Sequence, residues 1–228
     1  MIKKRLAAQI AVYVTGLFIL AFGVVFSINS HLGISPVNAL PFAVSLVSGV
    51  RMGICVTVFF LTCIALQIAL LRKKFQWINL TQIAFSFLFG YFVDVAMFIK
   101  GDFSLAFVAY DFGLPSYLGQ LAMLAISLVL IATGLTLYLE AKLISLPSEG
   151  FILALIHKFP ALKFHRVKIA MDCVLVSLAI LTTLVFMGGI YGAREGTVIA
   201  AVFVGKLIPY TRKVITRVLD KAGFYPNE

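Results

Sequence analysis

Two short stretches of this sequence set a proline and polar residues between long apolar runs: LGISPVNALP at 32–41 and LISLPSEGFI at 143–152. Proline fits the first turn of a helix, because that turn makes no use of the missing N–H. The free N–H groups of such a turn and the positive end of the helix dipole attract anionic groups. We therefore expect Pro36, Asn38, Pro147, Ser148 and Glu149 to contact a small solute, for example an anion or a carboxylate.

Asn38 and Glu149 also have a structural interpretation, and both roles can hold at once. An amide or carboxylate in the first turn of a helix is locally favourable, so each side chain can cap its own helix. His31 precedes Pro36 much as Lys142 precedes Pro147. We expect His31 to add a basic group to the solute site, whereas Lys142 is more simply a charge at the membrane surface.

The elements that position these residues are those of a membrane protein. Of 228 residues, 62% are hydrophobic and 12% charged, with a mean hydropathy of +1.07, whereas soluble domains carry roughly 25% charged residues. Runs long enough to cross a hydrocarbon layer of ~30 Å occur at 8–30, 52–72, 78–99, 116–139, 166–188 and 195–212. We predict an all-α, polytopic fold of six transmembrane helices, in which the shorter stretches 37–49 and 149–160 are re-entrant or broken half-helices.

The net charge of +10 is explained by the positive-inside rule, because the charges lie in short loops between spans. With six spans and a cytoplasmic amino terminus, 15 of the 19 Lys and Arg residues face the cytoplasm and three face outward. If the two short stretches also cross, the division becomes 13 against five. The larger asymmetry favours six spans with both termini in the cytoplasm.

An internal repeat relates the two halves of the sequence. A shift of 111 residues places Gly23 on Gly134, Pro36 on Pro147 and Asn38 on Glu149, and a shift of 115 places Arg51 on Arg166 and Gly90 on Gly205. Repeat 1 covers about 8–99 and repeat 2 about 116–212, within a single membrane domain, 1–228. Three crossings per repeat would make the repeat inverted, as in many secondary transporters. Chance similarity among apolar residues is the alternative.

Three ionisable residues lie inside predicted spans, where charge is costly and usually meets a partner or a cavity. Asp172 and Lys206 lie at similar depth, roughly 9 Å from the cytoplasmic ends of their spans at ~1.5 Å per residue. We predict an intramembrane ion pair between them; alternatively, Lys206 extends its side chain to the cytoplasmic surface. Asp94 lies near the outer end of its span, and we expect it to be solvated.

The sequence lacks the residue patterns of common catalytic and cofactor sites. No nucleophile, base and orienting acid share a recognisable motif, and the spacing of Cys and His does not match a metal site. Cys55, Cys63 and Cys173 lie in apolar runs, where we expect them to pack as small hydrophobes. We therefore expect no enzymatic activity, no metal, no cofactor and no nucleic-acid partner.

Two segments resemble the YczE/YitT family of small bacterial membrane proteins: LGISPVNAL, which follows a glycine-bearing run, and MGGIYGAREGTVIAAVFVGKLI at 187–208. A G-x-x-P-x-(D/N) element and a late Gly-Gly…Gly-Thr…Gly element recur in that family. The resemblance covers nearly the whole chain and implies a permease-like protein of the bacterial inner membrane without an assigned substrate. This sequence departs from the family's usual Gly-Ile-Gly-Thr run at 192–197, which reads Gly-Ala-Arg-Glu-Gly-Thr, so the resemblance assigns that loop no role.

These features together predict a membrane transporter or permease for a small solute, with its site between two inverted repeats. The rival from another class is a non-transporting membrane scaffold or regulator that acts on a partner protein through helix packing. We expect a multi-pass protein of the cell membrane in contact with the lipid bilayer. The sequence leaves open a homo-oligomer or a partner membrane protein.

The charge asymmetry predicts that position 74 is cytoplasmic and that 100–115 is external. In a background without the native cysteines, a Lys74→Cys variant should not react with an impermeant thiol reagent added to intact cells. A cysteine placed within 100–115 should react under the same conditions. Labelling of position 74 from outside would refute the six-span arrangement and the inverted repeat with it.

Overall fold

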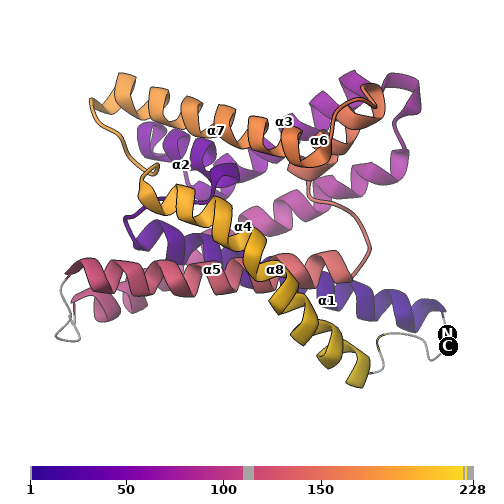
Figure 1. Ribbon diagram of the computed structural model, residues 1–228, viewed down its shortest axis with the longest axis horizontal. Coiled ribbons are helices and arrows are strands. Elements are labelled where there is room, and N and C mark those ends of the chain that lie inside the picture. The colour runs from indigo at the N-terminus through magenta and orange to yellow at the C-terminus, as the bar shows by residue number, and fades with distance from the viewer. Residues whose placement is uncertain (1, 110–115, 223, 225–228) are drawn as a thin grey trace. The chain divides into compact units, whose positions relative to one another are not determined.

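The structure is a computed structural model whose regular elements, over the residues it describes, are all helices (Figure 1). The described residues are 2–109, 116–222 and 224. Residues 110–115 of the predicted external loop lie outside them, as do residues 1, 223 and 225–228. The elements are α1 (Ile2–Asn29), α2 (Pro36–Ser48), α3 (Met52–Leu71), η1 (Arg72–Lys74), η2 (Trp77–Leu80), α4 (Thr81–Ala109), α5 (Ser116–Glu140), α6 (Pro147–Lys158), α7 (Phe164–Met187) and α8 (Glu195–Lys221).

Five helical segments in the described part of the chain are long and apolar enough to cross a membrane: Leu6–Asn29, Met52–Lys74, Trp77–Ile99, Tyr117–Glu140 and Phe164–Met187. They coincide with five of the six predicted spans, as a polytopic membrane protein requires. The sixth predicted span, 195–212, forms the first part of α8, which is not among the five. The number of crossings therefore stays a prediction. The two short stretches form α2 and α6, of 13 and 12 residues.

The two halves of the chain share one order of elements: a long helix, a short helix that begins with proline, and two long helices. The connections that follow α1 and α5 also share their local geometry. His31 and Lys142 both adopt left-handed backbone, with φ of 54° and 52°. The N–H of His31 donates to Ile28 O at 3.3 Å, and that of Lys142 to Leu139 O at 3.2 Å. Both pairs are related by the 111-residue shift that the sequence predicts.

The chain divides into two compact units, each drawn from both halves of the sequence. The first unit consists of Met1–Leu32, Val95–Leu143 and Val198–Glu228, and the second of Gly33–Asp94 and Ile144–Thr197. The first therefore contains α1 and α5, whereas the second contains both short helices, α2 and α6, together with α3 and α7. α4 and α8 each pass from one unit into the other.

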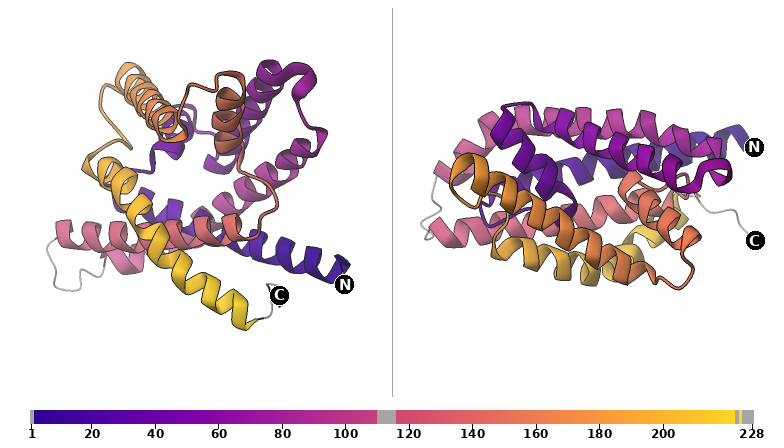
Figure 2. Two further views of the ribbon diagram at one scale, coloured as in Figure 1. Left: turned by 45° about the vertical axis from the view of Figure 1, so that its right-hand side comes forward. Right: turned by 90° about the horizontal axis from the view of Figure 1, so that it is seen from above.

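In the first unit, α1 and α5 lie side by side and run in opposite directions (Figures 1 and 2). Gln9 Nε2 donates to Ala141 O at 3.1 Å near one end of the pair, whereas Gly23 meets Ile131 nearer the other. Between these contacts, Gly16 and Gly134 face each other closely enough that a Cβ on either would strike the backbone of the opposite helix. Small residues thus allow close backbone approach, which drives helix association in lipid.

In the second unit, α2 packs on α7 and α6 packs on α3. Buried Ala39 and Ala43 of α2 face Ala179 of α7. α3 and α4 approach closely at Gly53 and Gly90, where a Cβ on either glycine would collide with the backbone of the other. Short side chains therefore bring helices together in this unit as well.

Asp94 corrects one sequence expectation, because it is half-buried and bound rather than simply solvated. Its Oδ1 accepts a hydrogen bond from the backbone N–H of Gly53 at 2.7 Å, and its Oδ2 lies 3.9 Å from Arg51 Nε. Gly53 belongs to the first turn of α3, whose N–H groups have no partner within the helix. Asp94 therefore caps α3 from the neighbouring helix.

The cysteines follow the sequence expectation only in part. Cys55 and Cys63 are buried, as expected of small hydrophobic residues, but Cys173 is exposed on α7. α7 contributes few buried side chains, and an apolar run alone does not reveal which of its faces is covered.

We predict that Gly134→Ala destabilises the protein by about 1–3 kcal/mol, a typical cost of overpacking, because the new Cβ would meet the backbone of Leu20 and Gly16. Thermal unfolding in detergent measures the loss as a lower apparent Tm. The matched control is Gly119→Ala on the same helix, where a Cβ has open space and alanine favours helix by ~1 kcal/mol. Equal Tm values for the two variants would contradict the close α1–α5 contact.

Candidate functional site

Both prolines of the interrupted stretches begin helices, as the sequence predicts. Pro147 is the first residue of α6, and the N–H of Gly150 makes the first helical hydrogen bond, to Leu146 O at 2.9 Å. Pro147 and Ser148 are buried and Glu149 is half-buried. The first turn of α6 therefore lies within the protein, and its surroundings decide what it can bind.

Two buried glutamine side chains contact the start of α6, and sequence reasoning missed both. Gln67 of α3 donates from Nε2 to Pro147 O at 3.0 Å. The same nitrogen donates to Gln82 Oε1 of α4 at 3.2 Å. Amides inside apolar runs are as unusual as ionisable groups there, and that rarity is the sequence signal that could have identified them.

These two bonds determine the orientation of both amide groups. Only the nitrogen of Gln67 can donate to the carbonyl of Pro147, and Gln82 must then present its oxygen to that nitrogen. Gln67 Oε1 and Gln82 Nε2 take no part in these two bonds. They lie 2.8 and 2.9 Å from the position that a Cβ would take on Gly150. One acceptor and one donor thus meet at the first turn of α6.

A line of small or polar side chains on α4 continues from this point. Gln82, Ser86, Gly90 and Asp94 recur every fourth residue and therefore share one face of the helix. Ser86 Oγ donates to Gln82 O at 2.7 Å, and Thr57 Oγ1 of α3 lies 3.4 Å from Ser86 O. The α3–α4 contact is therefore polar from the start of α6 to the cap of α3.

The start of α2 is bound differently, by the loop that follows α7. Ile34 N–H donates to Gly192 O at 3.0 Å. Gly33 adopts φ of 127°, and a Cβ there would lie 2.5 Å from Thr197 Oγ1. Asn38 is buried in the first turn of α2. The loop in which this sequence departs from the YczE/YitT pattern therefore contacts the chain just before α2.

The remaining predicted site residues have these local surroundings. His31 is exposed on the connection between α1 and α2. Asp172 Oδ2 lies 3.4 Å from Lys168 Nζ, one turn away on α7. Lys206 is exposed, with its Nζ 5.7 Å from the centre of the Phe203 ring. The pairing of Asp172 with Lys206 and the solute contact of His31 stay predictions.

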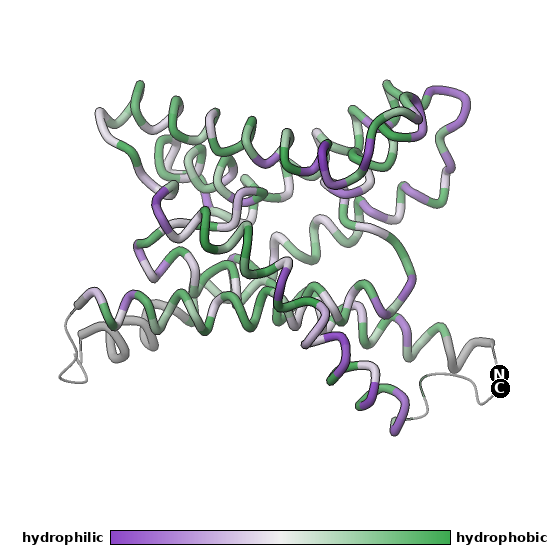
Figure 3. Tube along the Cα trace, viewed as in Figure 1, coloured by the Kyte–Doolittle hydropathy of each residue, from purple (hydrophilic) through white to green (hydrophobic). Residues whose placement is uncertain are grey.

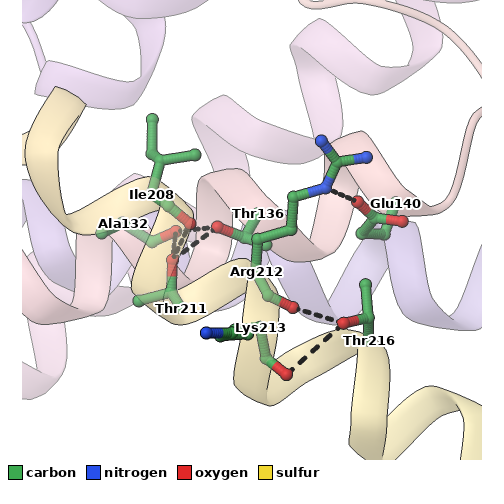
Figure 4. Close-up of polar contacts among 8 residues, drawn as sticks. All are labelled: Ala132, Thr136, Glu140, Ile208, Thr211, Arg212, Lys213 and Thr216. Carbon is green, nitrogen blue, oxygen red and sulfur yellow. Dashed lines mark hydrogen bonds and ion pairs between the residues drawn. The ribbon is translucent and has the colours of Figure 1, made fainter.

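A second polar cluster, in the first unit, joins α5 to α8 (Figure 4). Thr136 Oγ1 and Thr211 Oγ1 lie 2.8 Å apart, and Arg212 Nε donates to Glu140 Oε1 at 2.6 Å. The side chain of Glu140 is 6% exposed and that of Arg212 is 62% exposed. A buried carboxylate is costly unless it is paired, so this ion pair holds α8 against the end of α5.

Comparison with known proteins relates the chain to proteins without an assigned function. It matches DUF6198, described as a family of unknown function, over residues 7–213. Over 144 residues, which make up 62% of this chain, it is 32% identical to the uncharacterized protein YyaS of Bacillus subtilis strain 168. The chain spans about 65% of that relative's length. No solved structure matches. Neither match names the YczE/YitT family, so that resemblance stays a prediction.

We predict that Gln67→Leu destabilises the protein by about 1–3 kcal/mol, the cost of leaving buried acceptors unpaired, because Pro147 O and Gln82 Oε1 both lose their donor. The apparent Tm in detergent measures the loss. Gln76→Leu is the control, because Gln76 is exposed outside the α3–α6 contact. Similar Tm values for both variants would show that Gln67 does not support the start of α6.

Proposed function

We propose that this chain, which belongs to the DUF6198 family, is a membrane transporter or permease and that its solute contacts the first turn of α6. The observation that carries the proposal is the buried helix start beside Gln67 and Gln82. A helix start offers backbone N–H groups and a positive dipole end. Gln82 Nε2 and Gln67 Oε1 add a donor and an acceptor to the same place.

An inverted repeat would place this first turn between the two halves of the protein. α1 and α5, which the repeat relates, run antiparallel in the first unit, in support of inversion. In the second unit, α2 of the first half packs on α7 of the second, and α6 of the second half packs on α3 of the first. Transporters with inverted repeats bind solute where short, interrupted helices of the two halves meet. The exchanged packing of α2 and α6 therefore supports a solute site at these helices.

The chemistry of the α6 start favours a solute that carries a carboxylate, provided that Glu149 is neutral. Backbone N–H groups and Gln82 Nε2 would bind the carboxylate oxygens. Glu149 lies in the same turn, and two like charges that share a site disfavour each other strongly. Uptake of a carboxylate would therefore require that the charge of Glu149 be neutralised, by a proton or by a partner group.

Reconstituted protein tests the proposal directly. A panel of small carboxylates and their neutral analogues is screened for raised thermal stability of the purified protein in detergent, since a ligand that binds only the folded state stabilises it. Each stabilising compound is then assayed for uptake into proteoliposomes. Stable, folded protein that takes up none of the panel's compounds would contradict the proposal.

We predict that Glu149→Gln takes up a carboxylate at least about tenfold faster than the wild type, because the variant places no like charge in the first turn of α6. Uptake into proteoliposomes at one pH measures the difference. Glu195→Gln is the control, since Glu195 is exposed at the start of α8, and it should keep the wild-type rate. An unchanged uptake rate in Glu149→Gln would contradict a carboxylate bound beside Glu149.

A membrane scaffold or regulator is the second candidate, and the outer face of α7 favours it. Val174, Leu178, Leu181 and Val185 are exposed and recur at helical spacing along one face. In a bilayer such a stripe faces lipid or the helix of another membrane protein. The two candidates differ in reconstitution, because a transporter works alone whereas a scaffold has no uptake activity of its own.

A further inference from the structure

The last three turns of α8 pack within the first unit by one face. Arg212 pairs with Glu140 and Thr211 with Thr136, and the side chains of Ile215 and Leu219 are buried. Glu140 is the last residue of the apolar segment Tyr117–Glu140, which is long enough to cross a membrane. The ion pair therefore places this part of α8 at the end of a membrane-spanning helix, where hydrocarbon gives way to headgroups.

Next to the buried face of these turns, an exposed apolar line runs along the helix. Tyr210, Val214 and Val218 follow each other at intervals of four residues and expose 73%, 61% and 60% of their surface. Tyrosine is enriched at membrane interfaces because its ring is apolar and its hydroxyl is polar. The line has the residue types that an interfacial helix inserts among lipid chains.

A line of basic side chains runs beside the apolar one. Lys213, Arg217 and Lys221 are exposed, also at intervals of four residues, and form no ion pair within the described part of the chain. Asp220 is the one acidic residue between Tyr210 and Lys221. Figure 3 shows the change from the apolar first half of α8 to this hydrophilic second half. An amphipathic helix with basic residues beside its apolar face is typical of segments that lie on anionic membranes.

We propose that α8 from Tyr210 to Lys221 docks on anionic phospholipid, with its apolar line among the acyl chains and its basic line on the phosphate groups. A soluble acidic protein would complement the three basic side chains but leave the apolar line beside the bilayer without a role. Phospholipid complements both lines at once and is already present at the end of α5. Each basic side chain near an anionic surface contributes about fivefold to the attraction, so the three together contribute on the order of a hundredfold.

A single tryptophan in the apolar line tests the proposal in the full chain. Trp77 is 80% exposed and Val214 is 61% exposed, so Trp77→Phe with Val214→Trp moves the native fluorophore onto α8 at little structural cost. The protein is reconstituted in phosphatidylcholine vesicles with or without phosphatidylglycerol, and lipids brominated in the acyl chains report insertion by quenching. We expect bluer emission and stronger quenching in the anionic vesicles, and a partial reversal of both at high salt.

Charge variants in the same background identify the side chains responsible. Replacement of Lys213, Arg217 and Lys221 by glutamine should abolish the difference between the anionic and neutral vesicles. The matched control replaces Lys73, Lys74 and Lys163, which are exposed elsewhere, and should keep it. Three outcomes would overturn the proposal. The first is equal quenching of the reporter protein in both vesicle types, which requires no charge variant to fold.

The second is an equal loss of the anionic–neutral difference in both triple variants. The third is a blue shift that soluble polyglutamate, a model of an acidic protein, causes in neutral vesicles.

Discussion

The burial of two helix starts is the constraint on which the rest of this structure depends. A helix start leaves backbone N–H groups without partners in the helix, and burial of an unpaired polar group costs free energy. α2 begins at Pro36 and α6 at Pro147, and both prolines are buried. Proline removes one N–H donor from each start. The packing of the second unit must accommodate the remaining free N–H groups of the first turn. Contacts of α3, α4 and the loop after α7 surround these two starts: Gln67 and Gln82 meet that of α6, and Gly192 O binds Ile34 N–H just before α2.

The two starts are accommodated by different chemistry, and that difference gives the α6 start its functional interest. The chain before α2 bonds to the backbone of Gly192 and contacts Thr197. α6 instead meets the side-chain amides of Gln67 and Gln82. Gly192 O already accepts a hydrogen bond from Ile34 N–H, so it can do little to select a solute. At the start of α6, Gln82 Nε2 is a donor and Gln67 Oε1 an acceptor, and both lie beside Gly150. Of the two starts, that of α6 is therefore the better equipped to recognise a polar solute.

The helices are joined largely by polar groups and by close backbone contacts. Lipid is as apolar as leucine, so apolar side chains alone give helices in a membrane little reason to associate. Asp94 joins α4 to the start of α3, and the Glu140–Arg212 pair joins α5 to α8. Between such contacts, glycines such as Gly16 and Gly134 let the backbones approach. The same rule explains why an exposed apolar face on α7 is compatible with a stable fold in a bilayer.

The sequence by itself determined the features that depend on local pattern: the apolar helices, the half-helices that begin at Pro36 and Pro147, and the 111-residue correspondence between the helix ends at His31 and Lys142. Span length, proline and chain register are properties of neighbouring residues, so they can be read without knowledge of the packing. Only the tertiary structure decided which faces meet, and with them the roles of Gln67, Gln82 and Glu140, the cap formed by Asp94 and the exposure of Cys173. The physical reason is that a helix apolar on all sides has no preferred face, so its partners are chosen by single polar groups whose neighbours lie far away in the sequence.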